Sequence, residues 1–249
     1  MIMQKYGLIG YPLSHSFSQG FFNEKFSAEE IDAVYINFEI PSITGFQAII
    51  DGNPELNGLN VTIPYKEEVI PFLDELDDTA REIGAVNVIR FVREKKKIKL
   101  KGYNSDVIGF TRSIQDHLLP HHTKALILGT GGASKAVAYA LKQLGIEFKF
   151  VSRVPKYGEL AYSDLNQEKM DEFTVIINCT PLGMFPKVDA APDIPYQYVS
   201  DKHLLYDLLY NPNETKFMKL GAAKGATVLN GLEMLLLQAY AAWDIWNKI

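Results

Sequence analysis

A lysine stands just beyond a short strand-like segment, where a cation is electrostatically awkward. In LNVTIPYKEEV, residues 59–69, apolar residues alternate with Asn60 and Thr62, which predicts a strand with one apolar and one polar face. Pro64 ends this strand, and YKEEVIPFLDEL then predicts a helix. A helix N-terminus disfavours a cation, so Lys66 there should have a lowered pKa. An amine of that kind suits proton transfer.

A carboxylate elsewhere in the chain could hold that lysine. Asn104-Ser105-Asp106 precedes another helical pattern, and Asp106 is by itself a typical helix N-cap. If Asp106 faced Lys66, the pair would suit acid–base chemistry, although their spacing in the sequence alone does not bring them together. Both interpretations of Asp106 therefore stay open.

Two smaller polar groups follow apolar segments in the first half of the chain. Ser14 and Ser16 come after GLIGYPL, and Asn87 lies among small and apolar residues in IGAVNV. Ser16 is equally well explained as a helix N-cap. These side chains are candidates for ligand contacts.

A glycine turn marks the second half of the chain. KALILGTGGASKAVAYALKQLGIEFKFVSR predicts a buried strand, a turn at 129–134, a helix and a second strand, which is a βαβ unit. Gly129 allows the tight turn, and Gly131 lets the backbone approach a pyrophosphate held by helix N–H groups. The whole context, rather than the glycines alone, indicates a dinucleotide site.

The end of the second strand bears on which dinucleotide binds. An NAD site places an acidic side chain there, on the ribose hydroxyls, whereas this chain has Ser152 and Arg153. A guanidinium pairs with a 2′-phosphate. Arg153 therefore favours NADP over NAD.

Composition excludes several other classes of protein. A length of 249 residues allows one large or two smaller domains, and a net charge of −5 gives no argument for nucleic acid or an anionic membrane. The single cysteine, Cys179, rules out an intramolecular disulfide, and no metal-ligand spacing is found. The N-terminus lacks a signal-peptide pattern, so a cytoplasmic location is expected.

The motifs together resemble the shikimate dehydrogenase family. They are Ser14-x-Ser16, NVTIPYK, GAVN, NSD, GTGGAS, NCTPLGM, YDLLYNP and NGLEMLLLQ, in that family's order over residues 14–238. The resemblance implies two α/β domains with a cleft between them. A substrate domain would comprise residues 1–103 and 231–249, and a Rossmann-like NADP-binding domain with a parallel sheet would comprise residues 104–230.

The resemblance also implies an activity and a site. The family reduces 3-dehydroshikimate to shikimate with NADPH in aromatic amino-acid biosynthesis, with the lysine and the aspartate as the catalytic pair. By resemblance, the catalytic residues are Lys66 and Asp106, and the substrate-binding residues are Ser14, Ser16, Thr62, Lys66, Asn87, Asp106, Tyr210 and Gln238. Cofactor contacts would come from Asp78, Gly129, Thr130, Gly131, Gly132, Ala133, Ser152, Arg153, Thr180, Leu208 and Gly231. Ser152-Arg153-Val154 replaces the family's usual Asn-Arg-Thr and keeps only the arginine.

Two alternatives compete with this interpretation. One is a quinate/shikimate dehydrogenase that uses NAD, against which Ser14, Ser16, Thr62 and Arg153 argue. The other is a non-catalytic sensor of shikimate-like ligands, which would not need to keep both Lys66 and Asp106. The sequence does not fix the assembly state, for which a homodimer is one option.

Overall fold

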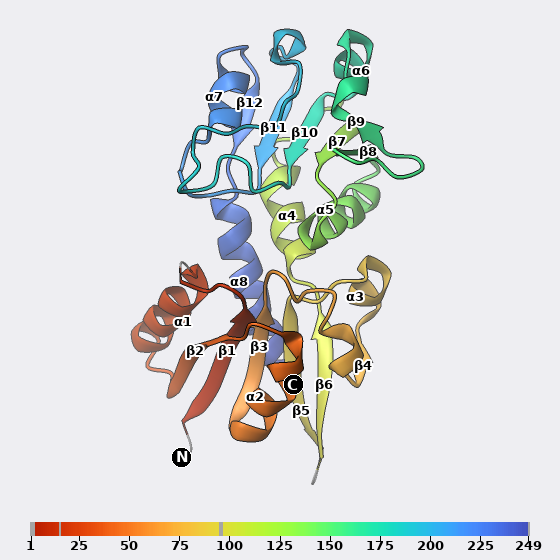
Figure 1. Ribbon diagram of the computed structural model, residues 1–249. Helices are drawn as coiled ribbons and strands as arrows, with labels where there is room; N and C mark the ends of the chain where they lie inside the picture. Colours follow the sequence, from red (N-terminus) through yellow and green to blue (C-terminus); the bar gives the residue numbers. More distant parts are fainter. Residues whose placement is uncertain (1–2, 15, 95–96, 249) are drawn as a thin grey trace. The chain divides into compact units, whose positions relative to one another are not determined.

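The computed structural model describes residues 3–14, 16–94 and 97–248. The chain divides into two compact units, Met1–Ser105 with Ala239–Ile249, and Asp106–Gln238. Each unit contains one six-stranded sheet (Figure 1). The predicted α/β class, with a Rossmann-like parallel sheet in the second half, is confirmed.

The first unit contains a mixed sheet of order β2-β1-β3-β5-β6-β4. Its strands β1, β2 and β3 run parallel, and β5 runs antiparallel to both β3 and β6. The elements are β1 (Gln4–Gly10), α1 (Phe17–Ala28), β2 (Ala33–Glu39), a 3₁₀ turn at Ile43–Gly45, α2 (Phe46–Gly52), β3 (Leu56–Val61), a 3₁₀ turn at Ile70–Phe72, β4 (Glu75–Leu76), α3 (Asp78–Ile83), β5 (Val88–Glu94) and β6 (Lys97–Tyr103).

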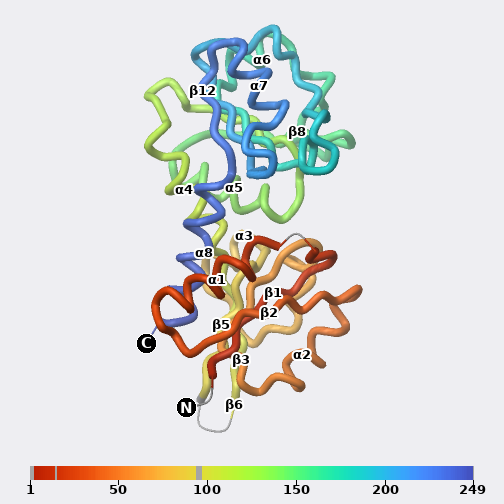
Figure 2. Tube along the Cα trace, turned by 90° about the vertical axis from the view of Figure 1, so that its left-hand side faces the viewer, coloured from red at the N-terminus to blue at the C-terminus, as the bar shows by residue number. Residues whose placement is uncertain are grey.

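Helices cover both faces of this sheet, as Figure 2 shows for α1 and α2. On one face, Phe46 of α2 packs with Leu59 and Ile89 in one apolar cluster. On the other face, Phe22 of α1 packs with Tyr6 and with Trp246 from the last helix, α8 (Leu232–Trp246). The sheet is therefore the middle layer of an α/β/α sandwich.

The second unit contains an all-parallel sheet of order β12-β11-β10-β7-β8-β9. If the strands are numbered 1 to 6 in chain order from β7, and the sheet is read from β9 to β12, this is the 3-2-1-4-5-6 order of a dinucleotide-binding fold. Its elements are α4 (Asp106–Gln115), β7 (Lys124–Leu128), α5 (Gly132–Gln143), β8 (Glu147–Ser152), β9 (Leu160–Ala161), a 3₁₀ turn at Tyr162–Asp164, α6 (Gln167–Glu172), β10 (Val175–Asn178), a 3₁₀ turn at Tyr196–Tyr198, β11 (Leu204–Asp207), α7 (Lys216–Ala222) and β12 (Thr227–Leu229).

Alternating side chains on β11 show how both faces of this sheet are buried. Leu205 packs with Phe217 of α7, whereas the ring of the next residue, Tyr206, contacts Phe110 of α4. The Tyr206 hydroxyl also lies 2.7 Å from the Ser113 hydroxyl of α4. Burial on both faces is the reason that the strands read as continuous apolar runs in the sequence.

The helix predicted over YKEEVIPFLDEL is wrong. Residues 63–69 form turns, and only the short 3₁₀ turn and β4 follow. Pro71 explains the difference, because proline inside a helix lacks the N–H group that the helix needs and disfavours helical geometry at the preceding residue. Without a regular helix, the macrodipole argument for Lys66 loses its basis.

The chain passes between the two units at two places. It leaves the first unit between Ser105 and Asp106 and re-enters it between Gln238 and Ala239, inside α8. The prediction placed the two joints at 103/104 and 230/231. The assignment of substrate to one domain and cofactor to the other stays a prediction.

Candidate functional site

The loops after β1 and β3 meet at one edge of the first sheet. The Tyr11 amide donates a hydrogen bond to the Ile63 carbonyl at 3.1 Å, and the Thr62 amide donates to the Ile9 carbonyl at 2.9 Å. Parallel neighbouring strands end at the same edge, so the segment with Ser14 and the segment with Thr62 are brought together.

Lys66 and Asn87 are attached to the same edge through their backbones. The Lys66 carbonyl accepts a 2.7 Å hydrogen bond from the Val86 amide, and the Asn87 carbonyl accepts one of 2.9 Å from the Val61 amide. Because β5 runs antiparallel to β3, it begins where β3 ends. The structure thus gathers Thr62, Lys66 and Asn87 around one point in the first unit.

The Asn87 side chain fixes the segment that leads to Asp106. Its Oδ1 accepts a hydrogen bond from the Ser105 amide at 2.7 Å, and its Nδ2 donates to the Ser105 hydroxyl at 3.0 Å. Asn104 is also bonded, because its Nδ2 donates to the Ala85 carbonyl at 3.0 Å. Asn87 therefore has a structural role, and its predicted contact with substrate stays a prediction.

Asn60 does not offer an open polar face, contrary to the sequence pattern. Its Oδ1 accepts a hydrogen bond from the Tyr35 hydroxyl at 2.8 Å, and its Nδ2 donates to the Asn87 carbonyl at 3.2 Å. The side chain is buried on the face of the sheet that carries the apolar cluster with Tyr35 and Trp246. The alternating pattern thus predicted the strand correctly, but it did not show that the Asn60 amide is buried and hydrogen-bonded within the core.

Ser16 occupies the N-cap position of α1 without acting as a side-chain cap. Its extended backbone precedes Phe17, but its hydroxyl makes no capping bond. The Oγ atom is shielded from solvent and has no hydrogen-bond partner among the residues that the structure describes. A buried hydroxyl without a partner is costly, and a polar ligand group would satisfy it. Ser14 is exposed.

The two carboxylates predicted for the site, Asp106 and Asp78, differ in burial. Asp106 is the first residue of α4 and is buried at 6% exposure. It belongs to the second unit and Lys66 to the first, so their pairing stays a prediction. Asp78 begins α3, is fully exposed and pairs with Arg81 at 2.8 Å, and its cofactor contact also stays a prediction.

The predicted glycine turn follows β7 in the second unit. Gly129 has a φ of +100°, which L side chains rarely adopt, so the turn requires glycine. Gly131 is the N-cap of α5, and a side chain there would meet no atom within 4 Å. Thr130, Gly132 and Ala133 complete a turn whose backbone N–H groups begin a helix. This open cradle fits a pyrophosphate.

Thr180 lies against the glycine turn at the point where the strand order reverses. β7 and β10 are neighbours, and the connections that follow them lead to β8 on one side and to β11 on the other; ligands of such sheets bind beyond the carboxyl ends of those strands. The Thr180 methyl carbon is 3.1 Å from the position that a Cβ on Gly129 would take. The structure thus joins two predicted cofactor residues from distant parts of the sequence.

Leu208 and Gly231 are also brought together. A Cβ atom on Gly231 would lie 2.0 Å from the Leu208 carbonyl oxygen, a distance that no real contact allows. The Gly231 amide donates a hydrogen bond to the Leu209 carbonyl at 2.9 Å. Gly231 is therefore required by the close approach of two backbones, whatever its contact with cofactor.

Tyr210 and Gln238, the substrate contacts predicted in the second half, are both partly buried. Burial raises the pKa of Tyr210 above its usual value. Gln238 lies on α8, where its Nε2 donates to the Leu235 carbonyl at 2.9 Å, and its backbone approaches Gly109 of α4. The hydrogen-bond partner that the partly buried Gln238 side chain needs is thus supplied in part by α8 itself.

Ser152 ends β8 and Arg153 follows it, at the same edge of the sheet as the glycine turn. The Ser152 hydroxyl accepts a 3.3 Å hydrogen bond from the Val154 amide, which shapes the loop. Arg153 is exposed and makes no hydrogen bond or ion pair with any described residue. A guanidinium in this state can bind a phosphate without first losing another partner.

A buried polar network was not predicted from the sequence. Asp207 Oδ1 accepts from Asn178 Nδ2 at 3.0 Å and from the Leu209 amide at 3.1 Å, while Oδ2 accepts from the Thr215 hydroxyl at 2.6 Å. Burial raises the Asp207 pKa to about 6, and the hydrogen bonds oppose this rise. The only signal in the sequence was a polar residue at the end of each of two buried strands.

A histidine pair lies before β7, at the opposite end of that strand from the glycine turn. His122 Nδ1 accepts a hydrogen bond from the Leu119 amide at 3.0 Å, and its Nε2 lies 3.1 Å from the Lys202 carbonyl. The carbonyl can only accept, so His122 is neutral with its proton on Nε2. Burial, above all, lowers its pKa.

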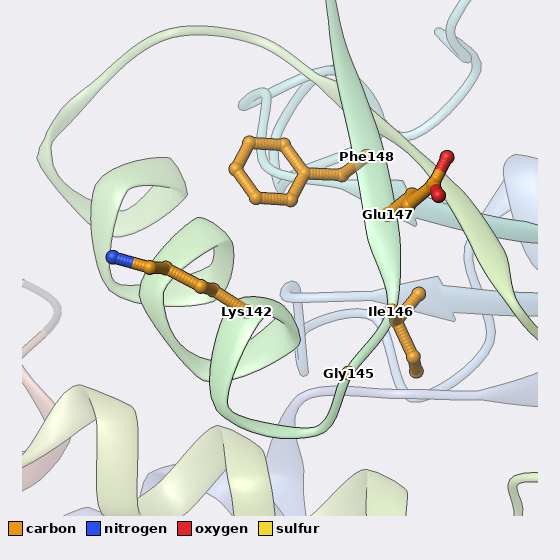
Figure 3. A pocket seen from close by; sticks show the side chains of 5 residues that line it. All are labelled: Lys142, Gly145, Ile146, Glu147 and Phe148. Atoms are coloured by element: carbon orange, nitrogen blue, oxygen red, sulfur yellow. The ribbon is translucent and has the colours of Figure 1, made fainter.

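One hollow in the second unit lies apart from the predicted cofactor residues. A shallow hollow of about 410 Å³ lies at the end of α5 and the start of β8, lined by Lys142, Gly145, Ile146, Glu147 and Phe148 (Figure 3). This is the opposite end of the βαβ unit from the glycine turn. Within the described residues, no group of three or more potential metal ligands occurs, and no helix has the length and apolarity to cross a membrane.

Fold and site together define a two-unit α/β protein with a dinucleotide-binding second unit. Residues 8–89 match the sequence profile of the shikimate dehydrogenase substrate binding domain. A shikimate dehydrogenase (NADP(+)) from Carboxydothermus hydrogenoformans is 40% identical, with 98% of this chain and 91% of that protein covered.

Solved structures agree with this match. The crystal structure of shikimate dehydrogenase from Aquifex aeolicus has a TM-score of 0.86 and 38% identity, with 98% of this chain and 92% of that chain covered. The shikimate 5-dehydrogenase of Thermus thermophilus, solved with NADP(H) and shikimate, has a TM-score of 0.86 and 29% identity, with 99% and 94% covered. This chain belongs to the shikimate dehydrogenase family, as its motifs predicted.

Proposed function

We propose that this protein is an NADP-dependent shikimate dehydrogenase, which interconverts 3-dehydroshikimate and shikimate in aromatic amino-acid biosynthesis. Relatives of that name match nearly the whole chain. The observation that carries the proposal is the gathering of Thr62, Lys66 and Asn87 at one sheet edge, in a chain whose other sheet ends in an open glycine turn. Shikimate, with one carboxylate and three hydroxyls, needs a site of this polar kind.

Lys66 is the proton donor and acceptor in this proposal. When bound, NADPH supplies the hydride that reduces the substrate ketone. As the ketone carbon is reduced, charge develops on its oxygen, and the Lys66 ammonium gives that oxygen a proton; in the reverse direction, the Lys66 amine removes it. Asp106 holds the ammonium and a neighbouring substrate hydroxyl. The Ser16 hydroxyl, which has no partner among the described residues, binds the substrate carboxylate together with Ser14.

The second unit holds the cofactor in the same proposal. The N–H groups that open α5 bind the pyrophosphate, and Thr180 lies beside them. Arg153 binds the 2′-phosphate, which makes NADP the preferred cofactor over NAD. A cytoplasmic location and a homodimer, both raised by the sequence, belong to this proposal as predictions.

Substitution of Lys66 tests the proposed chemistry. Lys66→Ala should lower kcat for NADP-linked shikimate oxidation by roughly 10²–10⁴-fold, the range of general acid–base catalysis, with little change in shikimate binding. Lys97→Ala, which removes an equal charge from an exposed position at the start of β6, should leave kcat unchanged. Near-normal turnover in Lys66→Ala would show that the assigned role is wrong.

Substrate and cofactor comparisons separate the alternatives. Steady-state rates of the unchanged protein with shikimate or quinate, each with NADP or NAD, should give the highest kcat/KM for shikimate with NADP. A higher kcat/KM for quinate with NAD would favour the quinate/shikimate dehydrogenase. Shikimate binding without any turnover would favour the sensor.

A further inference from the structure

The side chain of Asp207 is fully buried and joins three loops at the carboxyl edge of the second sheet. Its two oxygens accept hydrogen bonds from Asn178 at the end of β10, from the Leu209 amide after β11, and from Thr215 at the start of α7. Asp207, Asn178 and Thr215 are each 0% exposed. A carboxylate that receives three donors in the interior is a fixed point for the loops that supply them.

Asn178 links Asp207 to Thr180, the residue that contacts the glycine turn. Its Oδ1 accepts hydrogen bonds from the Thr180 amide at 3.0 Å and from the Thr180 hydroxyl at 2.7 Å. A backbone amide can only donate, so the oxygen of Asn178 must face Thr180 and its NH₂ must face Asp207. The carboxylate thus selects one of the two orientations of the Asn178 amide.

Thr180 in turn is in contact with the turn that begins the cofactor site. Its methyl group packs against Gly129, and the amide of the intervening residue, Cys179, donates to the Leu128 carbonyl at 2.9 Å. A rotated Asn178 amide would present its NH₂ to the Thr180 amide, two donors facing each other, and would displace Thr180. A continuous series of contacts therefore runs from Asp207 through Asn178 and Thr180 to Gly129.

We propose that Asp207 is a positioning residue for NADP, which holds Thr180 and the glycine turn in their binding geometry through Asn178. Asp207 itself does not touch the cofactor in this proposal. The inference rests on the proposed function, because it takes the glycine turn and Thr180 as the cofactor site. It adds a buried carboxylate to the requirements for NADP binding, which neither the glycine pattern nor the motif order predicted.

The test measures NADPH binding by fluorescence titration without shikimate, on the full chain, above neutral pH where the carboxylate is ionised. Asp207→Leu removes both acceptor oxygens and should raise the Kd for NADPH about tenfold or more, as the loss of a charge-assisted hydrogen bond predicts. Asp207→Asn keeps one acceptor but turns an NH₂ toward one set of donors, so a rise of roughly three- to fivefold is expected.

Ser113→Ala is the matched control for general loss of stability. It removes a buried hydrogen bond to Tyr206, the neighbour of Asp207 on β11, which is not connected to the loop after β10. This variant should unfold at a lower temperature than the unchanged protein yet bind NADPH with the same Kd. A merely structural Asp207 would behave in the same way as this control.

The outcomes distinguish failure of the positioning role of Asp207 from failure of the proposed NADP site. A folded Asp207→Leu variant with an unchanged Kd would overturn the positioning role. If that variant does not fold, an unchanged Kd in Asp207→Asn overturns it equally. Failure of the unchanged protein to bind NADPH would overturn the cofactor assignment and this inference with it, whereas normal binding by the unchanged protein and by both variants overturns the inference alone.

Discussion

Replacement of Gly231 by alanine should disturb the second unit much more than an alanine substitution normally does. The added Cβ would lie 2.0 Å from the Leu208 carbonyl oxygen and 2.5 Å from its carbonyl carbon, both of them backbone atoms. Relief requires the two backbones to separate by about 1 Å, which also breaks the 2.9 Å hydrogen bond from the Gly231 amide to Leu209. Overpacking costs about 1–3 kcal/mol and a lost hydrogen bond about 1 kcal/mol, so a loss of roughly 2–4 kcal/mol is expected.

Thermal unfolding followed by circular dichroism measures this loss. For a protein of 249 residues, 1 kcal/mol lowers the Tm by about 2–4 °C, so Gly231→Ala should lower it by roughly 5–15 °C. Gly20→Ala is the control: Gly20 lies within α1, and its Cβ would meet no atom within 4 Å. Because alanine favours helix by up to about 1 kcal/mol over glycine, this change should stabilise the protein slightly. A Gly231→Ala protein as stable as the parent would refute the reasoning.

Two further predictions concern charge. Because burial lowers the pKa of His122 below the 6.5 of an unfolded chain, the unfolded state alone gains a proton as the pH falls through about 6.5. The Tm should therefore fall with falling pH in that range, less steeply in His122→Asn but equally steeply in His117→Asn, an exposed control; equal slopes in all three proteins would contradict this. Arg153→Ser should raise the KM for NADP by roughly 10–100-fold while leaving the KM for NAD unchanged. Lys219→Ser, which removes an exposed charge from the same unit, should change neither KM, and an unchanged KM for NADP in Arg153→Ser would exclude a phosphate contact.

The sequence allowed the strands and the dinucleotide-binding order of the second half to be recognised, because buried parallel strands and a glycine turn are local signals. It failed over residues 65–76, where charged residues after Pro64 imitate a helix start. There, apolar spacing alone favoured a helix, but Pro71 interrupts the backbone hydrogen bonds that a helix needs.

The candidate site was predictable residue by residue but not as a set of contacts. Motif order indicated Thr180 and Gly129 separately, and only the parallel pairing of β7 with β10 makes them neighbours. Asn60 was expected to face the site, yet Tyr35 from another strand occupies its oxygen. Asp207 was not singled out at all, since its partners lie on other loops. Side-chain hydrogen bonds of this kind depend on tertiary structure, which sequence spacing does not encode.

The division of α8 between the two units has a consequence for the order in which the protein is synthesised. The core of the first unit includes Trp246, whose ring nitrogen donates to the Ile89 carbonyl at 3.1 Å and whose ring fills the space above Gly58. A ribosome delivers Gly58 and Ile89 long before it delivers Trp246. All residues of the second unit have been added by Gln238, before Trp246 is added to complete the core of the first unit. The half of the protein that is made first is therefore the half that is finished last.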